Sequence, residues 1–126
     1  MTDAPWPVEL KVSGGRDRLT VAFDDGTLAE LSAEYLRVHT PSAERTGHGA
    51  RQVIGGKRGV CIVALTPVGR YAVRIGFDDG HDSGIYPLTT LKPLADAHEA
   101  NWARYVAELE ATGLDRERPG TAPAPT

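Results

Sequence analysis

The sequence contains a single cysteine, Cys61, in 126 residues. A lone cysteine excludes an internal disulfide framework and is usual for proteins of a reducing compartment. No apolar run approaches the roughly 18 residues that a membrane-spanning helix needs, and the first residues lack the basic and apolar regions of a signal peptide. These absences predict a soluble, cytoplasmic protein without a membrane partner.

Aromatic residues and excess charge are also scarce. The chain has two Trp, four Tyr and two Phe, so its core should rest mainly on Val, Leu and Ile. The net charge of −3 gives no general argument for nucleic-acid binding. The most basic stretch lacks the interleaved aromatics that stack on single-stranded bases. At this length we expect one small domain and no nucleic-acid partner.

Alternating apolar and polar residues predict strands over 8–12, 19–23, 27–31 and 71–77. The sequence Phe-Asp-Asp-Gly occurs twice, at 23–26 and 77–80, and Asp-Gly between two such runs predicts a type I′ hairpin turn. The repetition of this motif is compatible both with an internal duplication and with two independent turns.

The apolar run at 60–65 predicts a central strand that is covered on both faces and followed by a turn at 66–69. Cys61 would then be inert packing inside this strand. The sequence has neither a GxSxG elbow nor a complete phosphate-binding loop around Lys57, so we expect no catalytic triad and no nucleotide-hydrolysing site.

Two helices are predicted. Ser32 is a plausible N-cap for a short helical turn over 33–36, and residues 96–99 resemble a capping box for a longer C-terminal helix. An apolar stripe marks that helix, and Gly113 followed by Leu114 is typical of a Schellman stop. The stripe, which we expect to be core, consists of Trp102, Tyr105, Val106 and Leu109.

The predicted fold is therefore α+β: a small, mostly antiparallel sheet domain with a short helical turn and one C-terminal helix packed on it. We expect residues 1–7 to be a flexible N-terminus and residues 8–114 to form the domain. The Pro-, Ala- and Thr-rich residues 115–126 predict a disordered tail.

The candidate site lies in the long loop of residues 40–58 and in the second Phe-Asp-Asp-Gly turn. Imidazole and carboxylate groups there form a reasonable ligand set for Zn or Fe, but none has a diagnostic spacing, so no cofactor is predicted outright. The alternative is that the aspartates shape turns and the histidines bond to backbone. The candidate residues are His39, His48, Asp79, His81, Asp82 and Ser83, with His39, His48 and His81 as the candidate metal ligands.

The segment 37–58 is strongly basic. It has five basic residues against the single acid Glu44, a local balance of +4 in a chain of −3. Such a concentration can hold an anionic ligand or an acidic partner, although a solvated loop is the simpler explanation. The residues of this basic loop are Arg37, Arg45, Arg51, Lys57 and Arg58.

Taken together, these segments resemble a bacterial family of unknown function, named for its likeness to the N-terminal domain of gamma-butyrobetaine hydroxylase. The resemblance covers roughly residues 8–114. Its most specific parts are the sequences LRVHTPSAE at 36–44 and FDDGHDSGIY at 77–86.

The resemblance implies a domain without its own hydroxylase activity, because the related hydroxylase carries its iron- and 2-oxoglutarate-dependent chemistry in a separate domain. That relative binds a structural zinc through three cysteines and a histidine. The cysteine positions correspond to Thr40, Ser42 and Arg45 here, and only the histidine position, His81, keeps a ligand-type side chain. Similar domains also occur fused to P-loop ATPases linked to iron–sulfur cluster assembly.

Our leading hypothesis is a non-catalytic accessory module that binds a protein partner, with a P-loop ATPase of iron–sulfur assembly as a candidate. A metal-binding protein that uses His39, His48 and His81 is the second hypothesis, and an enzyme of unrecognised type is the third. The sequence leaves the oligomeric state open.

Overall fold

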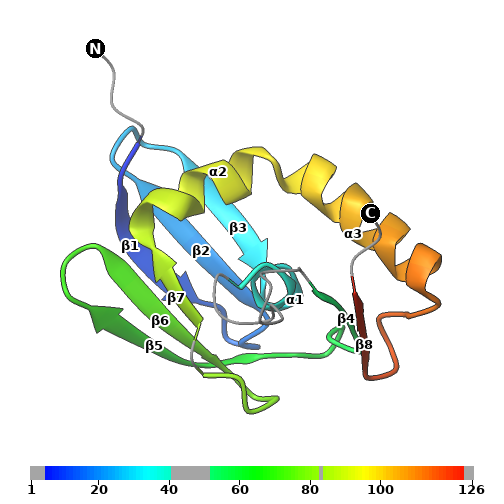
Figure 1. Ribbon diagram of the computed structural model, residues 1–126. Helices are drawn as coiled ribbons and strands as arrows, with labels where there is room; N and C mark the ends of the chain where they lie inside the picture. Colours follow the sequence, from blue (N-terminus) through cyan, green and yellow to red (C-terminus); the bar gives the residue numbers. More distant parts are fainter. Residues whose placement is uncertain (1–4, 41–51, 83, 124–126) are drawn as a thin grey trace.

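The computed structural model describes residues 5–40, 52–82 and 84–123. Within them, two three-stranded antiparallel sheets, a two-stranded ribbon and three α-helices form an α+β fold, which confirms the predicted class (Figure 1). The first sheet contains β1 (Pro7–Val12), β2 (Arg18–Phe23) and β3 (Leu28–Ser32), and the second contains β5 (Ile62–Val68), β6 (Ala72–Phe77) and β7 (Gly84–Pro87). The remaining elements are α1 (Ala33–Val38), β4 (Gln52–Gly55), η1 (Leu88–Thr90), α2 (Leu91–Asp96), α3 (His98–Thr112) and β8 (Gly120–Pro123).

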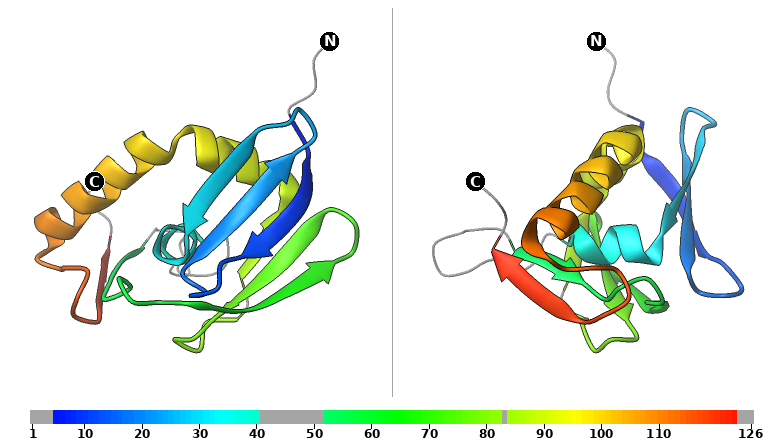
Figure 2. Two further views of the ribbon diagram at one scale, coloured as in Figure 1. Left: turned by 180° about the vertical axis from the view of Figure 1, so that it is seen from behind. Right: turned by 90° about the vertical axis from the view of Figure 1, so that its right-hand side faces the viewer.

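The main core lies between the two sheets, which face each other in Figure 2. Alternate residues of β2 and β6 point inward, as the period-2 pattern requires. Tyr35 and Leu36 of α1 close the core, and both are fully buried. The inward residues of the two central strands are Leu19, Val21, Phe23, Val73, Ile75 and Phe77.

The two sheets are built alike. In each, the first strand pairs with the second through a register shift near its start, at Pro7/Glu9 in one sheet and Ile62/Ala64 in the other. Each meander then turns at a Phe-Asp-Asp-Gly motif, and a helix follows it in the chain. This correspondence extends beyond a shared turn motif, so the structure favours an internal duplication of a βββα unit over two independent turns.

The two motif turns have the same conformation, and it is not the predicted type I′. Only the glycines, Gly26 at φ 89° and Gly80 at φ 92°, have positive φ in these motifs. Gly26 N–H donates to Phe23 O at 3.0 Å and Gly80 N–H donates to Phe77 O at 3.2 Å. This pattern is a type I turn followed by a glycine in the left-handed conformation. Like a type I′ turn, it is compatible with the right-handed twist of the two strands that it joins.

The apolar run at 60–65 does not form a central strand. β5 begins at Ile62, pairs with β6 alone among the described strands, and continues through the predicted turn to Val68. It is an edge strand with one solvent-facing side, so apolarity alone misled the prediction. Cys61 precedes the strand and is half-buried, not sealed within it.

The helix signals were partly correct. Ser32 Oγ accepts the Tyr35 N–H at 3.0 Å, which confirms the predicted N-cap of α1. The capping box at 96–99 is wrong: Ala97 precedes α3, and Asp96 belongs to α2, where it pairs with Lys92 at 2.7 Å. Its carboxylate is therefore unavailable to cap α3.

The end of α3 follows the prediction, and so do Tyr105 and Leu109 of its predicted core stripe, whereas Trp102 and Val106 are only half-buried. Gly113 has φ 74°, and Leu114 N–H donates to Leu109 O at 2.9 Å, the long bond of a Schellman motif. Tyr105 and Leu109 are buried and pack with Val53 of β4 in a second, smaller core. α3 thereby extends past the sheets to the β4–β8 ribbon (Figure 1).

Residues 115–123 are part of the fold, contrary to the predicted disordered tail. β8 pairs antiparallel with β4, and Arg116 reaches back to Glu34 of α1. The backbone near Pro119 passes so close to Gly56 (φ 75°) that a Cβ there would lie 2.6 Å from it. Such pairing depends on tertiary contacts, which composition does not reveal.

The ordered domain also begins earlier than position 8. β1 starts at Pro7, and Trp6 packs edge-on against Tyr71 with ring centroids 6.2 Å apart. The longest described helix, α3, has 15 residues, and no helix in the described ranges is long and apolar enough to cross a membrane.

Candidate functional site

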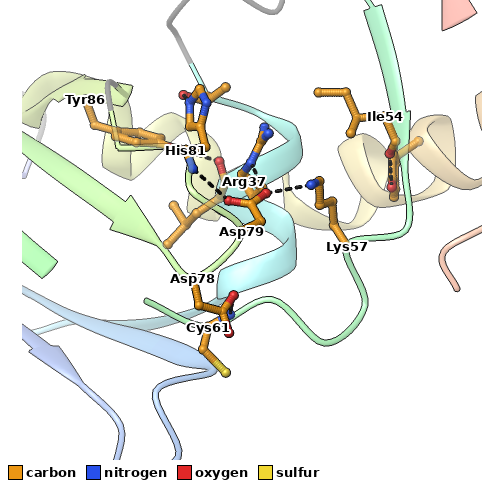
Figure 3. A network of polar contacts seen from close by, with 11 residues as sticks. Arg37, Ile54, Lys57, Cys61, Asp78, Asp79, His81 and Tyr86 are labelled. Carbon is orange, nitrogen blue, oxygen red and sulfur yellow. Dashed lines mark hydrogen bonds and ion pairs between the residues drawn. The ribbon is translucent and has the colours of Figure 1, made fainter. Parts of the chain in front are cut away.

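The second motif turn holds the most highly connected carboxylate of the predicted site, that of Asp79 (Figure 3). Asp79 Oδ2 accepts hydrogen bonds from Arg37 Nε at 2.8 Å and from Lys57 Nζ at 2.6 Å. Its Oδ1 accepts the backbone N–H of His81 at 3.0 Å. The site thus joins the last turn of α1, the segment after β4, and the β6–β7 turn.

These charges are shielded from solvent. The side chains of Arg37, Lys57 and Asp79 are only 8%, 18% and 18% exposed. Burial by itself raises the pKa of Asp79, but hydrogen bonds from Lys57, the His81 N–H and Arg37 outweigh it and lower that pKa to about 2. Asp79 is therefore a permanent carboxylate near neutral pH and is poorly suited to general acid–base catalysis there.

Comparison with the first motif turn shows what is particular to the second. In both turns the first aspartate exchanges bonds with the residue before the adjoining strand: Asp24 with Trp6, and Asp78 with Cys61. In both, the second aspartate accepts the N–H two residues later. Asp25 lies at the surface, whereas Asp79 also binds two cations. The first turn is architecture, and the second is an ion-pair centre.

His39 and His81 lie on different elements and contact different residues. His39 caps the end of α1, and its Nδ1 lies 2.9 Å from Tyr35 O. His81 Nε2 lies 3.4 Å from Thr40 Oγ1. Positions 40 and 81, which correspond to ligand positions in the family resemblance, are thus neighbours joined by a hydroxyl–imidazole contact.

Several predicted site residues lie outside the described residues: Arg45, His48, Arg51 and Ser83. Convergence of the three histidines is consequently not tested. Among the described ranges, no cluster of three or more His, Cys, Asp or Glu side chains could hold a metal ion.

The described part of the basic loop is divided between two places. Arg37 and Lys57 both bind Asp79, whose single carboxylate balances one of their two positive charges. Arg58 points elsewhere and pairs with Glu117 at 2.5 Å, with both side chains 61% exposed. Asp82 is exposed at the end of the second turn. Among the described residues of the basic loop, Arg37 and Lys57 thus lie together at Asp79, and Arg58 lies apart from them.

Sequence reasoning missed a second group of side chains. Arg116 donates to both carboxylate oxygens of Glu34, at 2.7 and 2.6 Å, and its guanidinium lies 5.1 Å from the Trp102 ring centroid. These three residues line a pocket of about 380 Å³ together with His98 and Arg58. Arg116 lies in the segment predicted to be disordered, so no sequence signal linked it to Glu34.

Known proteins resemble this chain over most of its length. A family model described as gamma-butyrobetaine hydroxylase-like, N-terminal, matches residues 10–92. The chain belongs to this family. That match contains Asp79 and both of its cationic partners, and it ends before α3.

Solved structures agree with the fold. Two NMR solution structures each have a TM-score of 0.79. The first is 39% identical in sequence, and the match covers 90% of this chain and 90% of that chain. The second is 43% identical, and the match covers 91% of this chain and 87% of that chain. A crystal structure of a DUF971-family protein of unknown function from Acidithiobacillus ferrooxidans has a TM-score of 0.59 and 33% identity, covering 71% of this chain and 92% of that chain. No match to a curated protein was found.

Proposed function

We propose that this family member is a non-catalytic accessory module that binds a protein partner through the outer face of the β5–β6–β7 sheet. The observation that carries the proposal is a group of large apolar side chains exposed on this sheet: Val63, Val68 and Ile85 are 51%, 37% and 44% exposed. Exposed apolar groups gathered on one face are typical of protein-binding surfaces.

The strand register shows which residues lie on the outer face. Arg74 of β6 lies between Thr66 and Ile85, and Val68 lies opposite Ala72. These positions alternate with the buried Val73 and Ile75, so they point away from the core. The result is an outer face of mostly apolar and small residues that also carries Arg74.

The predicted site adjoins this surface. A Cβ placed on Gly76 would lie 3.8 Å from Val63 Cγ2 and 3.6 Å from Asp82 Cβ. The turn that begins at Asp78 therefore forms one margin of the outer face. In this proposal, the ion pairs of Asp79 hold that margin rigid, which lowers the conformational cost of binding.

The resemblance supplies the first partner to test, a P-loop ATPase of iron–sulfur cluster assembly. We expect Ile85→Arg to weaken binding of this purified ATPase about tenfold or more, because a charge would replace an exposed apolar contact. Leu28→Arg is the matched control, since Leu28 is 72% exposed on the other sheet. Calorimetric titration of both variants measures the effect.

Three outcomes decide between the parts of the proposal. Weaker binding by Ile85→Arg alone supports the outer face. Equal binding by the wild type and both variants rejects that face, and no binding by the wild type rejects the ATPase as partner. In the last case, crosslinking of each variant in cell extract tests whether another protein contacts the face.

A metal-binding role is the second candidate, favoured by the contact of His81 with Thr40, the residue that follows His39 in the chain. Neutral imidazoles bind Zn and Fe well, and His48 would complete the proposed ligand set. Elemental analysis of protein prepared without a histidine tag tests it. Less than about a tenth of an equivalent of either metal, with no thermal shift when they are added, would exclude this role.

A further inference from the structure

We propose that the pocket between α1, α3 and Arg116 binds a small ligand that combines a flat aromatic ring with an anionic group. This site is separate from the outer sheet face, so the inference goes beyond the proposed function. The pocket has a volume of about 380 Å³, within the range of small-molecule sites. Its walls come from both halves of the chain, and only the fold brings them together.

One wall is aromatic. His98 and Trp102 stand one turn apart on α3, and their rings are parallel to within 4°, with centroids 6.4 Å apart. The two rings therefore present parallel aromatic faces in the pocket lining, against which a planar ligand ring can lie.

The pocket lining is also cationic. Arg18 and Arg58 line the pocket with side chains 53% and 61% exposed. Their partners, Glu30 and Glu117, are 59% and 61% exposed, and such solvated pairs contribute little stability. An anionic ligand can therefore recruit either guanidinium without disrupting the fold. Arginine is also the side chain best suited to grip carboxylate or phosphate oxygens.

The base of the pocket is held in place by an ion pair. Glu34 is 6% exposed and binds Arg116 through both oxygens, and Arg116 in turn rests on Trp102. Counting Asp17, the lining has three arginines and two acids, a net charge of +1 with neutral histidine. Fixed aromatic and ionic walls beside two adaptable arginines are what an anionic ring compound requires.

The test is an NMR titration of the full-length, ¹⁵N-labelled protein. The indole N–H of Trp102 reports on the pocket, and that of Trp6, which packs against Tyr71 and lies outside the pocket lining, is the internal control. The probes are adenosine monophosphate, 2-naphthoate, adenosine and inorganic phosphate. We expect one or both of the first two to shift the Trp102 signal, and the last two to bind about tenfold more weakly.

Each probe decides one part of the proposal. Shifts from both ring-bearing anions support the shared chemistry, and a shift from only one identifies the anionic group as phosphate or carboxylate. If adenosine or phosphate alone binds as tightly as the combined probes, the requirement for a charged ring is wrong. Absence of any Trp102 shift at about 10 mM of every probe overturns the site.

Variants test the residues. Arg58→Ala should raise the dissociation constant about tenfold, the scale of one charge-assisted hydrogen bond, with a smaller rise for Arg18→Ala. Arg74→Ala on the outer sheet face is the matched control and should bind like the wild type. Wild-type affinity in both pocket variants would overturn the assignment of the arginines. Ile85→Arg should retain pocket binding, which separates this inference from the proposed function.

Discussion

The ion-pair centre at Asp79 makes a quantitative prediction about acid stability. Asp79→Asn removes the negative charge but keeps the size and shape of the side chain. In the wild type, the surroundings lower the pKa of Asp79 from 3.8 to about 2. A shift of that size corresponds to roughly 2 kcal/mol of native-state stabilisation, at about 1.4 kcal/mol per unit. We expect the variant to lose this amount at pH 7.

The sign of the pH dependence follows from linkage. A carboxyl group with a lower pKa in the folded state stabilises the protein above its unfolded pKa, and that contribution disappears as pH falls through the folded value. The difference between the wild type and Asp79→Asn should therefore be constant from pH 7 to about pH 5. It should shrink between about pH 4 and pH 2, where the wild-type side chain becomes protonated.

Urea unfolding at a series of pH values, followed by tryptophan fluorescence, measures this difference. Asp25→Asn is the matched control, because it makes the same change in the twin turn, where the carboxylate lies at the surface. We expect a clearly smaller effect there. A loss of stability in Asp79→Asn that stays unchanged down to pH 2 would refute the reasoning, since it would show that the side chain acts by packing and not by charge.

Two further predictions concern the C-terminal segment. Gly56→Ala should destabilise the fold by more than about 1 kcal/mol and expose β8 amides to hydrogen exchange, because a Cβ would collide with the backbone at Pro119 and φ is positive. Gly14→Ala is the control, because the space around Gly14 is open. Equal protection of the β8 amides in Gly56→Ala and the wild type would contradict the contact. Arg116→Leu should cost about 3 kcal/mol in thermal or urea unfolding, because it leaves the buried Glu34 unpaired. The double variant Arg116→Leu/Glu34→Leu should recover part of this loss, and no recovery would argue against the ion pair as its cause.

The two similar βββα units allow the second motif turn to be compared with the first. The twin turns share their backbone bonds, so the differences between them arise from what each turn meets. Asp25 faces solvent, whereas Asp79 meets Arg37 from α1 and Lys57 from the segment after β4. The ion-pair centre of the second turn thus comes from Arg37 and Lys57, which lie outside the turn itself.

The sequence by itself determined the local structure of this protein. Strand alternation, the Asp-Gly turns, the Ser32 cap and the Gly113 stop depend on contacts between residues close in the chain, and the structure agrees with each apart from the turn type. Family membership also followed from local motifs. These features can be predicted from the sequence because short-range sterics and hydrogen bonding depend on a few neighbouring positions in the chain.

Only the tertiary structure decided the partners of these elements. It placed the apolar β5 at an edge, paired β8 with β4, and joined Arg116 to Glu34 across 82 positions. In the structure Arg37 and Lys57 pair with Asp79. The number of basic residues in segment 37–58 had instead suggested a positive surface. The burial of a charged group and the partner it pairs with depend on which residues surround it in space. The sequence therefore reveals which charged groups the site contains but not which pairs they form.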